Sequence, residues 1–121
     1  MKIISFFNSD YNFSAKLARI CDIELNELLF ESDPKNIKKY KTSSLGFIII
    51  DIDDYRECLK ETVEDIKNYI DYPIYGLISK MDRKIQKNTI EIGFDIIMTK
   101  SNFLYNIKTI KKQIINASRI S

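Results

Sequence analysis

The stretch that decides the fold spans residues 47–54 and reads FIIIDIDD. Four consecutive apolar residues, preceded by Gly46 and followed by acids, are typical of a strand that is buried on both faces. Such strands lie in the middle of parallel sheets, which need helices on both sides. Because α/β proteins build their sites at the carboxyl ends of these strands, Asp51 is the first candidate functional residue. For Asp54 we prefer the simpler interpretation, a residue that stops the strand and caps the next helix.

The rest of the chain alternates between strand and helix patterns at nearly equal spacing. Strands are predicted over residues 2–7, 27–31, 46–51, 74–78 and 94–98. Helices are predicted over residues 11–21, 35–41, 56–71, 83–91 and from 103 onward, with a loop at 42–44. Asp33 with Pro34, and Asp82, are helix start signals, and Gly93 is a stop signal. Right-handed crossovers then give a five-stranded parallel sheet with helices on both faces, in one domain over residues 1–121.

Composition excludes several classes of protein. The 121 residues contain no histidine, which removes Ser-His-Asp triads, Cys-His nucleophiles and most zinc sites. With 3 glycines there is no glycine-rich phosphate loop. No apolar run approaches the ~20 residues of a membrane helix, and the N-terminus is too short for a secretory signal, so a cytoplasmic protein is expected. Cys21 and Cys58 are expected to be buried, reduced thiols on helices.

Charge is unevenly distributed along the chain. Residues 51–72 contain eight acids and three bases, whereas residues from 96 to the end contain five bases and no acid. This asymmetry indicates a polar partner surface. Nucleic-acid binding through the basic C-terminal helix is not expected, because the bases have no interleaved aromatic residues and the net charge is only +2.

Three segments resemble the receiver domain of bacterial response regulators, and the resemblance extends over essentially the whole chain. Residues 48–52 look like the phosphoacceptor strand of that family. Residues 93–101, GFDIIMTKS, look like its fifth strand, Gly-Ala-Asp-Asp-Tyr-Leu-Thr-Lys-Pro, and residues 72–79, YPIYGLIS, look like its fourth. The resemblance implies a flavodoxin-like fold with strand order 2-1-3-4-5. It also implies a signalling module of a two-component phosphorelay rather than an enzyme.

The resemblance also implies roles for individual residues. Asp51 matches the aspartate that takes a phosphoryl group from a histidine kinase, and Lys100 matches the lysine that pairs with the phosphoryl oxygens. A Mg²⁺ ion would be held by acids, for which Asp10, Asp51 and Asp53 are the candidates here. Ser79 is the candidate for the hydroxyl that binds the phosphate. The assignments of Asp51 and Lys100 also agree with physical chemistry, because negative charge in the transition state of attack by a carboxylate has to be neutralised by a nearby cation.

Several positions depart from the family pattern. Phe7 with Asn8, or Asn8 with Ser9, stand where the family has two adjacent acids after the first strand. Ile78 stands at the hydroxyl position, one residue before Ser79, and Ile97 replaces the strand-five aromatic residue. Two hypotheses follow. Either Asp51 is phosphorylated, or the receiver is degenerate and Asp51 and Lys100 form a structural ion pair. We favour the second, with poor Mg²⁺ binding, because the acid pair, the hydroxyl and the aromatic residue are lost together. Loss of metal support alone weakens transition-state stabilisation.

The expected function is therefore that of an atypical receiver, or pseudo-receiver, that acts by protein–protein contacts. Its partners would be a downstream signalling protein and, if Asp51 is phosphorylated, a histidine kinase or phosphotransfer protein. The fourth helix, fifth strand and fifth helix are the expected contact face, which is also a possible homodimer face. The residues expected on it are Asn88, Lys100, Tyr105, Lys108, Lys111 and Lys112. The alternative is a flavodoxin-like domain that binds a small ligand such as a flavin at the same strand ends.

Overall fold

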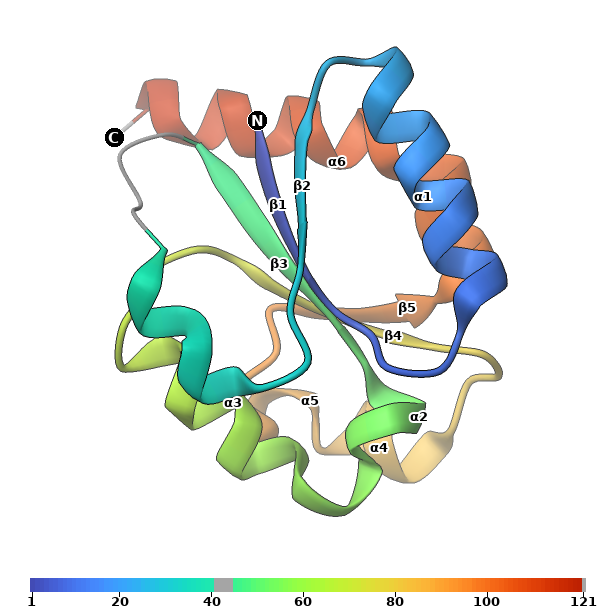
Figure 1. The fold of residues 1–121 in the computed structure, drawn as a ribbon. Helices are drawn as coiled ribbons and strands as arrows, with labels where there is room; N and C mark the ends of the chain where they lie inside the picture. Colours follow the sequence, from blue (N-terminus) through green and yellow to red (C-terminus); the bar gives the residue numbers. More distant parts are fainter. Residues whose placement is uncertain (41–44, 121) are drawn as a thin grey trace.

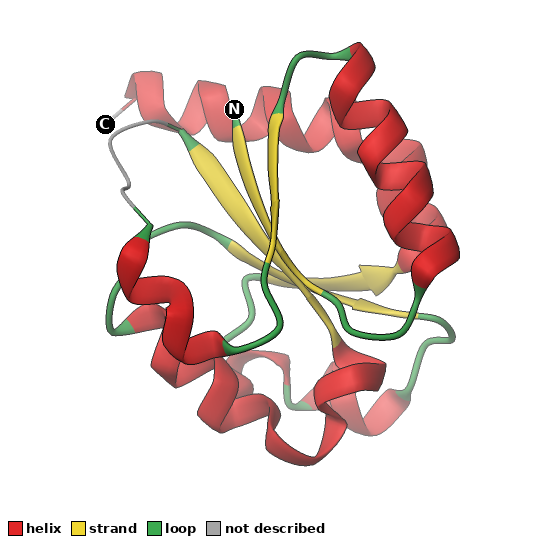
Figure 2. Ribbon diagram, viewed as in Figure 1, coloured by secondary structure: helices red, strands yellow, loops and turns green. Residues whose placement is uncertain are grey.

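A computed structural model describes residues 1–40 and 45–120, apart from the side chains of residues 90 and 118–120 (Figure 1). The predicted loop at 42–44 lies outside these residues. Five parallel strands form one sheet in the order β2-β1-β3-β4-β5, which confirms the predicted fold (Figures 1 and 2). The strands are β1 (Lys2–Phe6), β2 (Glu27–Phe30), β3 (Gly46–Asp51), β4 (Ile74–Ile78) and β5 (Ile96–Thr99).

The central strand β3 is buried along its whole length, as its apolar run predicts. Because successive side chains of a strand point to opposite faces, Ile48 and Ile50 join one core while Phe47 and Ile49 join the other. The register pairs Asp51 with Leu77 and Ile78 with Thr99. The carboxyl ends of β3, β4 and β5 therefore meet at one edge of the sheet.

Helices cover both faces of the sheet. Helices α1 and α6 lie together on one face, and the remaining helical segments lie on the other (Figure 1). The α-helices are α1 (Tyr11–Ile23), α2 (Ile52–Tyr55), α3 (Leu59–Lys67), α4 (Arg83–Lys87), α5 (Thr89–Ile92) and α6 (Lys100–Ile120). Two short 3₁₀ segments, η1 (Pro34–Lys39) and η2 (Arg56–Cys58), complete the set.

Two predicted helix starts are wrong, and capping explains both. The helix predicted to begin at residue 56 begins instead at Ile52, because the Asp51 carboxylate accepts a hydrogen bond from the Asp53 amide and caps α2. It then passes through η2 into α3, which ends at Lys67 rather than at residue 71. The last helix begins at Lys100 rather than at residue 103, since the Thr99 hydroxyl accepts a hydrogen bond from the Asn102 amide.

Other boundaries differ by less. The polar helix predicted over 83–91 is divided into α4 and α5, and it ends, as predicted, at Gly93 in a left-handed conformation with φ 108°. Strand β5 begins at Ile96 rather than at residue 94, because the main chain and side chain of Asp95 instead bond to Ile74.

The two cysteines differ in environment, which corrects one prediction. Cys21 is a buried free thiol, and burial raises its pKa to about 11. Cys58 is a free thiol but is exposed at the end of η2, because the 3₁₀ geometry turns it away from the apolar stripe of α3. Within the described chain, no helix has the length and apolar character needed to cross a membrane.

We predict that Ile49→Ala lowers the free energy of unfolding by about 2–5 kcal/mol, because it leaves a cavity in the middle of a fully covered strand. Urea denaturation would measure this loss. The matched control is Ile23→Ala, at a side chain that is 75% exposed, which is expected to change stability by at most about 0.5 kcal/mol. Equal losses in the two variants would contradict the assignment of β3 as the centre of the core.

Candidate functional site

Asp51 lies where β3 ends and α2 begins, and its side chain is only 1% exposed. One carboxylate oxygen, Oδ1, accepts the hydrogen bond from the Asp53 amide that caps α2. The other, Oδ2, lies 3.0 Å from Nζ of Lys100, although no described residue gives it a hydrogen bond of normal geometry. Burial raises the pKa of Asp51 to about 6, against the opposing effect of the Lys100 charge. Asp51 is thus a buried acid with one fixed cationic neighbour.

Lys100 is the first residue of α6, and its ammonium lies among three carboxylates. Its Nζ is 2.9 Å from Asp10 Oδ2, 3.0 Å from Asp51 Oδ2 and 3.5 Å from Asp53 Oδ2. The ring of Phe7 lies on another side, with its centroid 5.6 Å from the ammonium. Burial acts against the charged form, but Asp10 and Asp51 raise the pKa of Lys100 above its ordinary value. The predicted pairing of Asp51 with Lys100 is therefore present, together with two more acids.

The other two acids are held by the main chain of neighbouring loops. Asp10 caps α1 by accepting a hydrogen bond from the Phe13 amide. Asp53 accepts a hydrogen bond from the Ser79 amide and pairs with Arg56, whose guanidinium also reaches Asp82. The structure thus brings together the sequence-predicted residues Asp10, Asp51, Asp53, Ser79 and Lys100. Ser79 contributes its main-chain N–H to Asp53, and its role in binding a phosphate stays a prediction.

Asp54 has a role that the sequence interpretation missed. Its carboxylate accepts hydrogen bonds from the amides of Asn8 and Ser9, at 2.7 and 3.2 Å, and from the Ser9 hydroxyl. Burial would raise its pKa, but these bonds hold the pKa below its ordinary value. Asp54 therefore ties α2 to the loop after β1, whereas the cap that we assigned to it is made by Asp51.

This contact also explains the departure of residues 7–9 from the family pattern. Where the resemblance predicts two acids after β1, the chain has an aromatic ring that faces Lys100 and two residues that donate hydrogen bonds to Asp54. In the sequence, this contact is indicated only by a polar residue at Ser9 and an additional acid at Asp54. The two could not be paired before the structure had shown that the loop after β1 lies beside α2.

The arrangement of the acids bears on the predicted metal. Mg²⁺ prefers near-octahedral oxygen ligands about 2.0–2.1 Å away. In this structure the oxygens of Asp10, Asp51 and Asp53 converge on an ammonium group, and no set of three His, Cys, Asp or Glu side chains in residues 1–40 and 45–120 forms a metal-binding group. Mg²⁺ binding by Asp10, Asp51 and Asp53 stays a prediction.

The predicted basic contact face is wrong in part. Lys100 lines, together with Asp10 and Ser79, a pocket beside the buried Asp51, which we call the Asp51 pocket. Lys111 and Lys108 lie 2.6 and 4.0 Å from the Glu24 carboxylate at the end of α1. Tyr105 lines a groove between α6 and α1. These four side chains therefore face α1 or the pocket rather than β5. The prediction failed because the sequence shows only that these residues lie on one helix, and not which neighbouring element each side chain faces.

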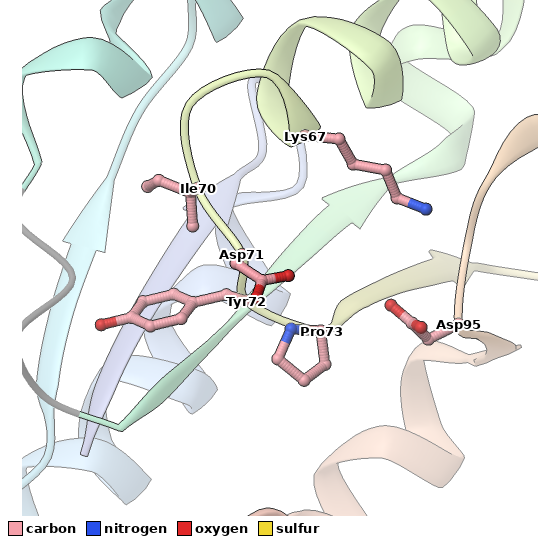
Figure 3. Close-up of a pocket in the computed structure, with 6 residues that line it drawn as sticks. All are labelled: Lys67, Ile70, Asp71, Tyr72, Pro73 and Asp95. Carbon is pink, nitrogen blue, oxygen red and sulfur yellow. The ribbon is translucent and has the colours of Figure 1, made fainter.

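A second pocket lies at the opposite edge of the sheet. It is lined by Lys67, Ile70, Asp71, Tyr72, Pro73 and Asp95 (Figure 3). The carboxylate of Asp95 has a structural role there, because it accepts a hydrogen bond of 2.7 Å from the Ile74 amide. None of the sequence-predicted site residues is there, so the candidate functional site is the pocket around Asp51.

We predict that Asp51→Asn is more stable than the wild-type protein at neutral pH, by about 1–2 kcal/mol. The pKa of Asp51 is about 6 in the folded state and therefore exceeds the ordinary value of 3.8, so protonation of Asp51 stabilises the folded protein. This stabilisation is fully present below pH 3.8 and is lost as the pH rises through about 6. The neutral amide keeps the cap and carries no charge to bury. Urea denaturation in chelator would show the advantage shrinking toward acid pH. A variant that is less stable at neutral pH would instead mean that the ion pair with Lys100 outweighs burial.

The comparisons with known proteins agree with the fold. No family model and no curated protein matches the sequence. Among solved structures, the chain is similar to a response regulator receiver protein from Pseudoalteromonas atlantica, with a TM-score of 0.66 and 14% sequence identity. The match covers 96% of this chain and 98% of that one. At this identity the likeness establishes that the chain has a receiver-like, flavodoxin-like fold.

Proposed function

We propose that the chain is a receiver-like signalling module that acts by protein–protein contacts and whose Asp51 pocket is neutralised internally by Lys100. The observation that carries this proposal is the position of the Lys100 ammonium, within 3.5 Å of Asp10, Asp51 and Asp53. A phosphoryl group arriving at Asp51 would bring further negative charge into a pocket whose one close lysine is already shared among three acids. Such a pocket is poorly prepared for phosphoryl transfer, which depends on electrostatic stabilisation by cations.

The loop after β1 supports the same conclusion. A receiver that binds Mg²⁺ needs carboxylates from this loop, but here the loop donates hydrogen bonds from Asn8 and Ser9 to Asp54. Asp10 is the one acid of this loop, and its carboxylate already lies 2.9 Å from the Lys100 ammonium, so the loop offers an incoming cation little. The pocket of this chain would therefore be an atypical or pseudo-receiver site, and Asp51 would serve chiefly to cap α2 and to hold Lys100.

Such a module would work by recognising other proteins. A downstream signalling protein is the partner that we propose, and a histidine kinase or phosphotransfer protein would join it only if Asp51 accepts a phosphoryl group. A homodimer through α4, α5, β5 and α6 remains part of the proposal. Ile96 on β5 is 41% exposed and is an apolar residue available to that face.

The alternative of a small-ligand binding domain is less well supported. A flavin or another phosphate-bearing ligand would need free amides in the loop after β1. Two amides of that loop, those of Asn8 and Ser9, already donate to Asp54. A visible-absorbance spectrum of the purified protein tests this alternative, and a flavin spectrum would favour it over the receiver proposal.

We predict that acetyl phosphate with Mg²⁺ labels Asp51 slowly or not at all, because the Lys100 ammonium is already shared among Asp10, Asp51 and Asp53. Intact-mass spectrometry over a time course would measure the label. Asp51→Asn serves as the background, and a receiver domain with the usual acid pair serves as the positive control. Rapid stoichiometric labelling that disappears in Asp51→Asn would overturn the proposal of an atypical site.

We further predict that Lys100→Met creates a metal dependence that the wild-type protein lacks. Removal of the ammonium leaves the carboxylates of Asp10, Asp51 and Asp53 without their shared cation, at a cost of about 3–5 kcal/mol in chelator. Mg²⁺ should restore part of this loss, since it would supply the missing positive charge. Calorimetric melting with and without Mg²⁺ measures both effects.

The matched control is Lys112→Met, which removes an exposed lysine from the same helix and should respond to neither condition. If Mg²⁺ raised the stability of the wild-type protein as much as it raises that of the Lys100→Met variant, the lysine and the metal would occupy the pocket together. Internal neutralisation by Lys100 would then be rejected.

A further inference from the structure

The turn after α1 contains an apolar residue in an unfavourable conformation. Leu25 has φ 58° and is the only non-glycine residue with positive φ in the described chain. Its amide donates to the Asp22 carbonyl and the Asn26 amide donates to the Cys21 carbonyl, which is the hydrogen-bond pattern that usually ends a helix at glycine. Leucine is strained there, and its side chain is also 90% exposed. Contacts within the described chain therefore compensate for neither cost.

A groove between α1 and α6 begins at the residue before Leu25. Its volume is about 360 Å³, and we call it the α1–α6 groove. It is lined by Ile20, Ile23, Glu24, Leu104, Tyr105, Ile107 and Lys108. Ile23 and Tyr105, which line the groove, are 75% and 91% exposed. Leu25 is 90% exposed and follows the lining residue Glu24 directly in the sequence, so it adds apolar surface next to that end of the groove. Contiguous apolar surface of this kind marks interaction sites.

The charges around the groove indicate the chemistry of its occupant. Glu24 is already neutralised by Lys111 at 2.6 Å, with Lys108 at 4.0 Å. Arg19 lies four positions before Ile23 on α1, and Lys112 lies four positions after Lys108 on α6, so helical spacing places both next to residues of the groove. Lys16 lines a neighbouring pocket that shares Leu104 with the groove. These three bases are exposed and form no ion pair with another described residue. Asp22 and Glu27, on either side of Leu25 in the sequence, are exposed acids, but the bases outnumber the acids, so the net charge around the groove is positive.

We propose that the α1–α6 groove binds an amphipathic helix of another protein, whose apolar stripe enters the groove and whose flanking residues are acidic. The apolar stripe would bury Ile23, Leu25 and Tyr105, and the acids would meet the bases around the groove. A second copy of this chain would bring the same net positive charge against itself, which costs binding energy. A lipid surface would lie across the concavity without filling it. The proposal concerns a surface apart from the Asp51 pocket and does not depend on its charge state.

The probe is a synthetic helical peptide of about five turns, with leucine at one helical stripe and glutamate at the other positions. NMR amide shifts of the full chain should change at Ile20, Ile23, Leu25, Leu104 and Tyr105 when this peptide is added. A peptide with lysine in place of each glutamate should bind at least about tenfold more weakly. Equal binding of both peptides, or shifts elsewhere with none in the groove, would overturn the proposal.

Leu25→Gly provides the decisive variant. Glycine accepts a positive φ without strain, so the variant should melt at a higher temperature, and yet it should bind the acidic peptide about tenfold more weakly. A residue with only a structural role would not separate stability from binding in this way. Tyr105→Ala should also weaken binding, whereas Tyr69→Ala, a control at an exposed tyrosine of the chain after α3, should not.

Two other outcomes would overturn the proposal in favour of a different occupant. Self-association that Tyr105→Ala abolishes, seen by analytical ultracentrifugation without peptide, would identify a second copy as the occupant. Binding to phosphatidylserine vesicles that Leu25→Gly abolishes, with no binding of the acidic peptide, would identify a membrane surface. Retention of peptide affinity in Leu25→Gly would exclude the groove as the binding site.

Discussion

The ammonium of Lys100 is the constraint on which the carboxyl edge of the sheet depends. Parallel topology brings the ends of β1, β3 and β5 to this edge, and the chain places Asp10, Asp51, Asp53 and Asp54 there. Four carboxylates this close would repel one another, and one of them, Asp51, is almost completely buried. Lys100 lies within ion-pair distance of three of them, so one partly buried cation stabilises segments that are far apart in the sequence.

The fourth acid, Asp54, is neutralised in a different way. It receives three hydrogen bonds from the loop after β1 instead of an ion pair. The edge therefore takes Asp51 from the end of β3 and Asp53 and Asp54 from α2. The loop after β1 supplies one acid, Asp10, and the hydrogen-bond donors for Asp54. On a receiver-like fold, this exchange is the basis of our proposal that the site is atypical and poorly suited to phosphoryl transfer. The fold alone does not assign an activity, so the charges of the site have to carry that argument.

The sequence predicted the fold because strand patterns and caps agree along most of the chain. It predicted the meeting of Asp51 and Lys100 because the ends of parallel strands must lie at one edge. It did not predict the partners of Asp54 or the direction of Lys108 and Lys111. Those depend on how loops and helices dock, and a helical stripe of lysines looks the same whichever neighbour it faces. Leu25 was missed for a similar reason, since neither the backbone φ angle nor the exposure of an apolar residue in a turn can be inferred from its residue type.

Helix α6 connects the pocket with the α1–α6 groove. Its first residue is Lys100, and Tyr105 and Lys108 of the groove follow within the next few turns. Between them Phe103 and Ile107 are buried against the sheet, and Glu24 fixes the helix to α1 through Lys111. One helix therefore carries both the ammonium that lies among the acids of the carboxyl edge and side chains of the surface that we propose binds a partner, so both depend on how α6 packs against the sheet and α1.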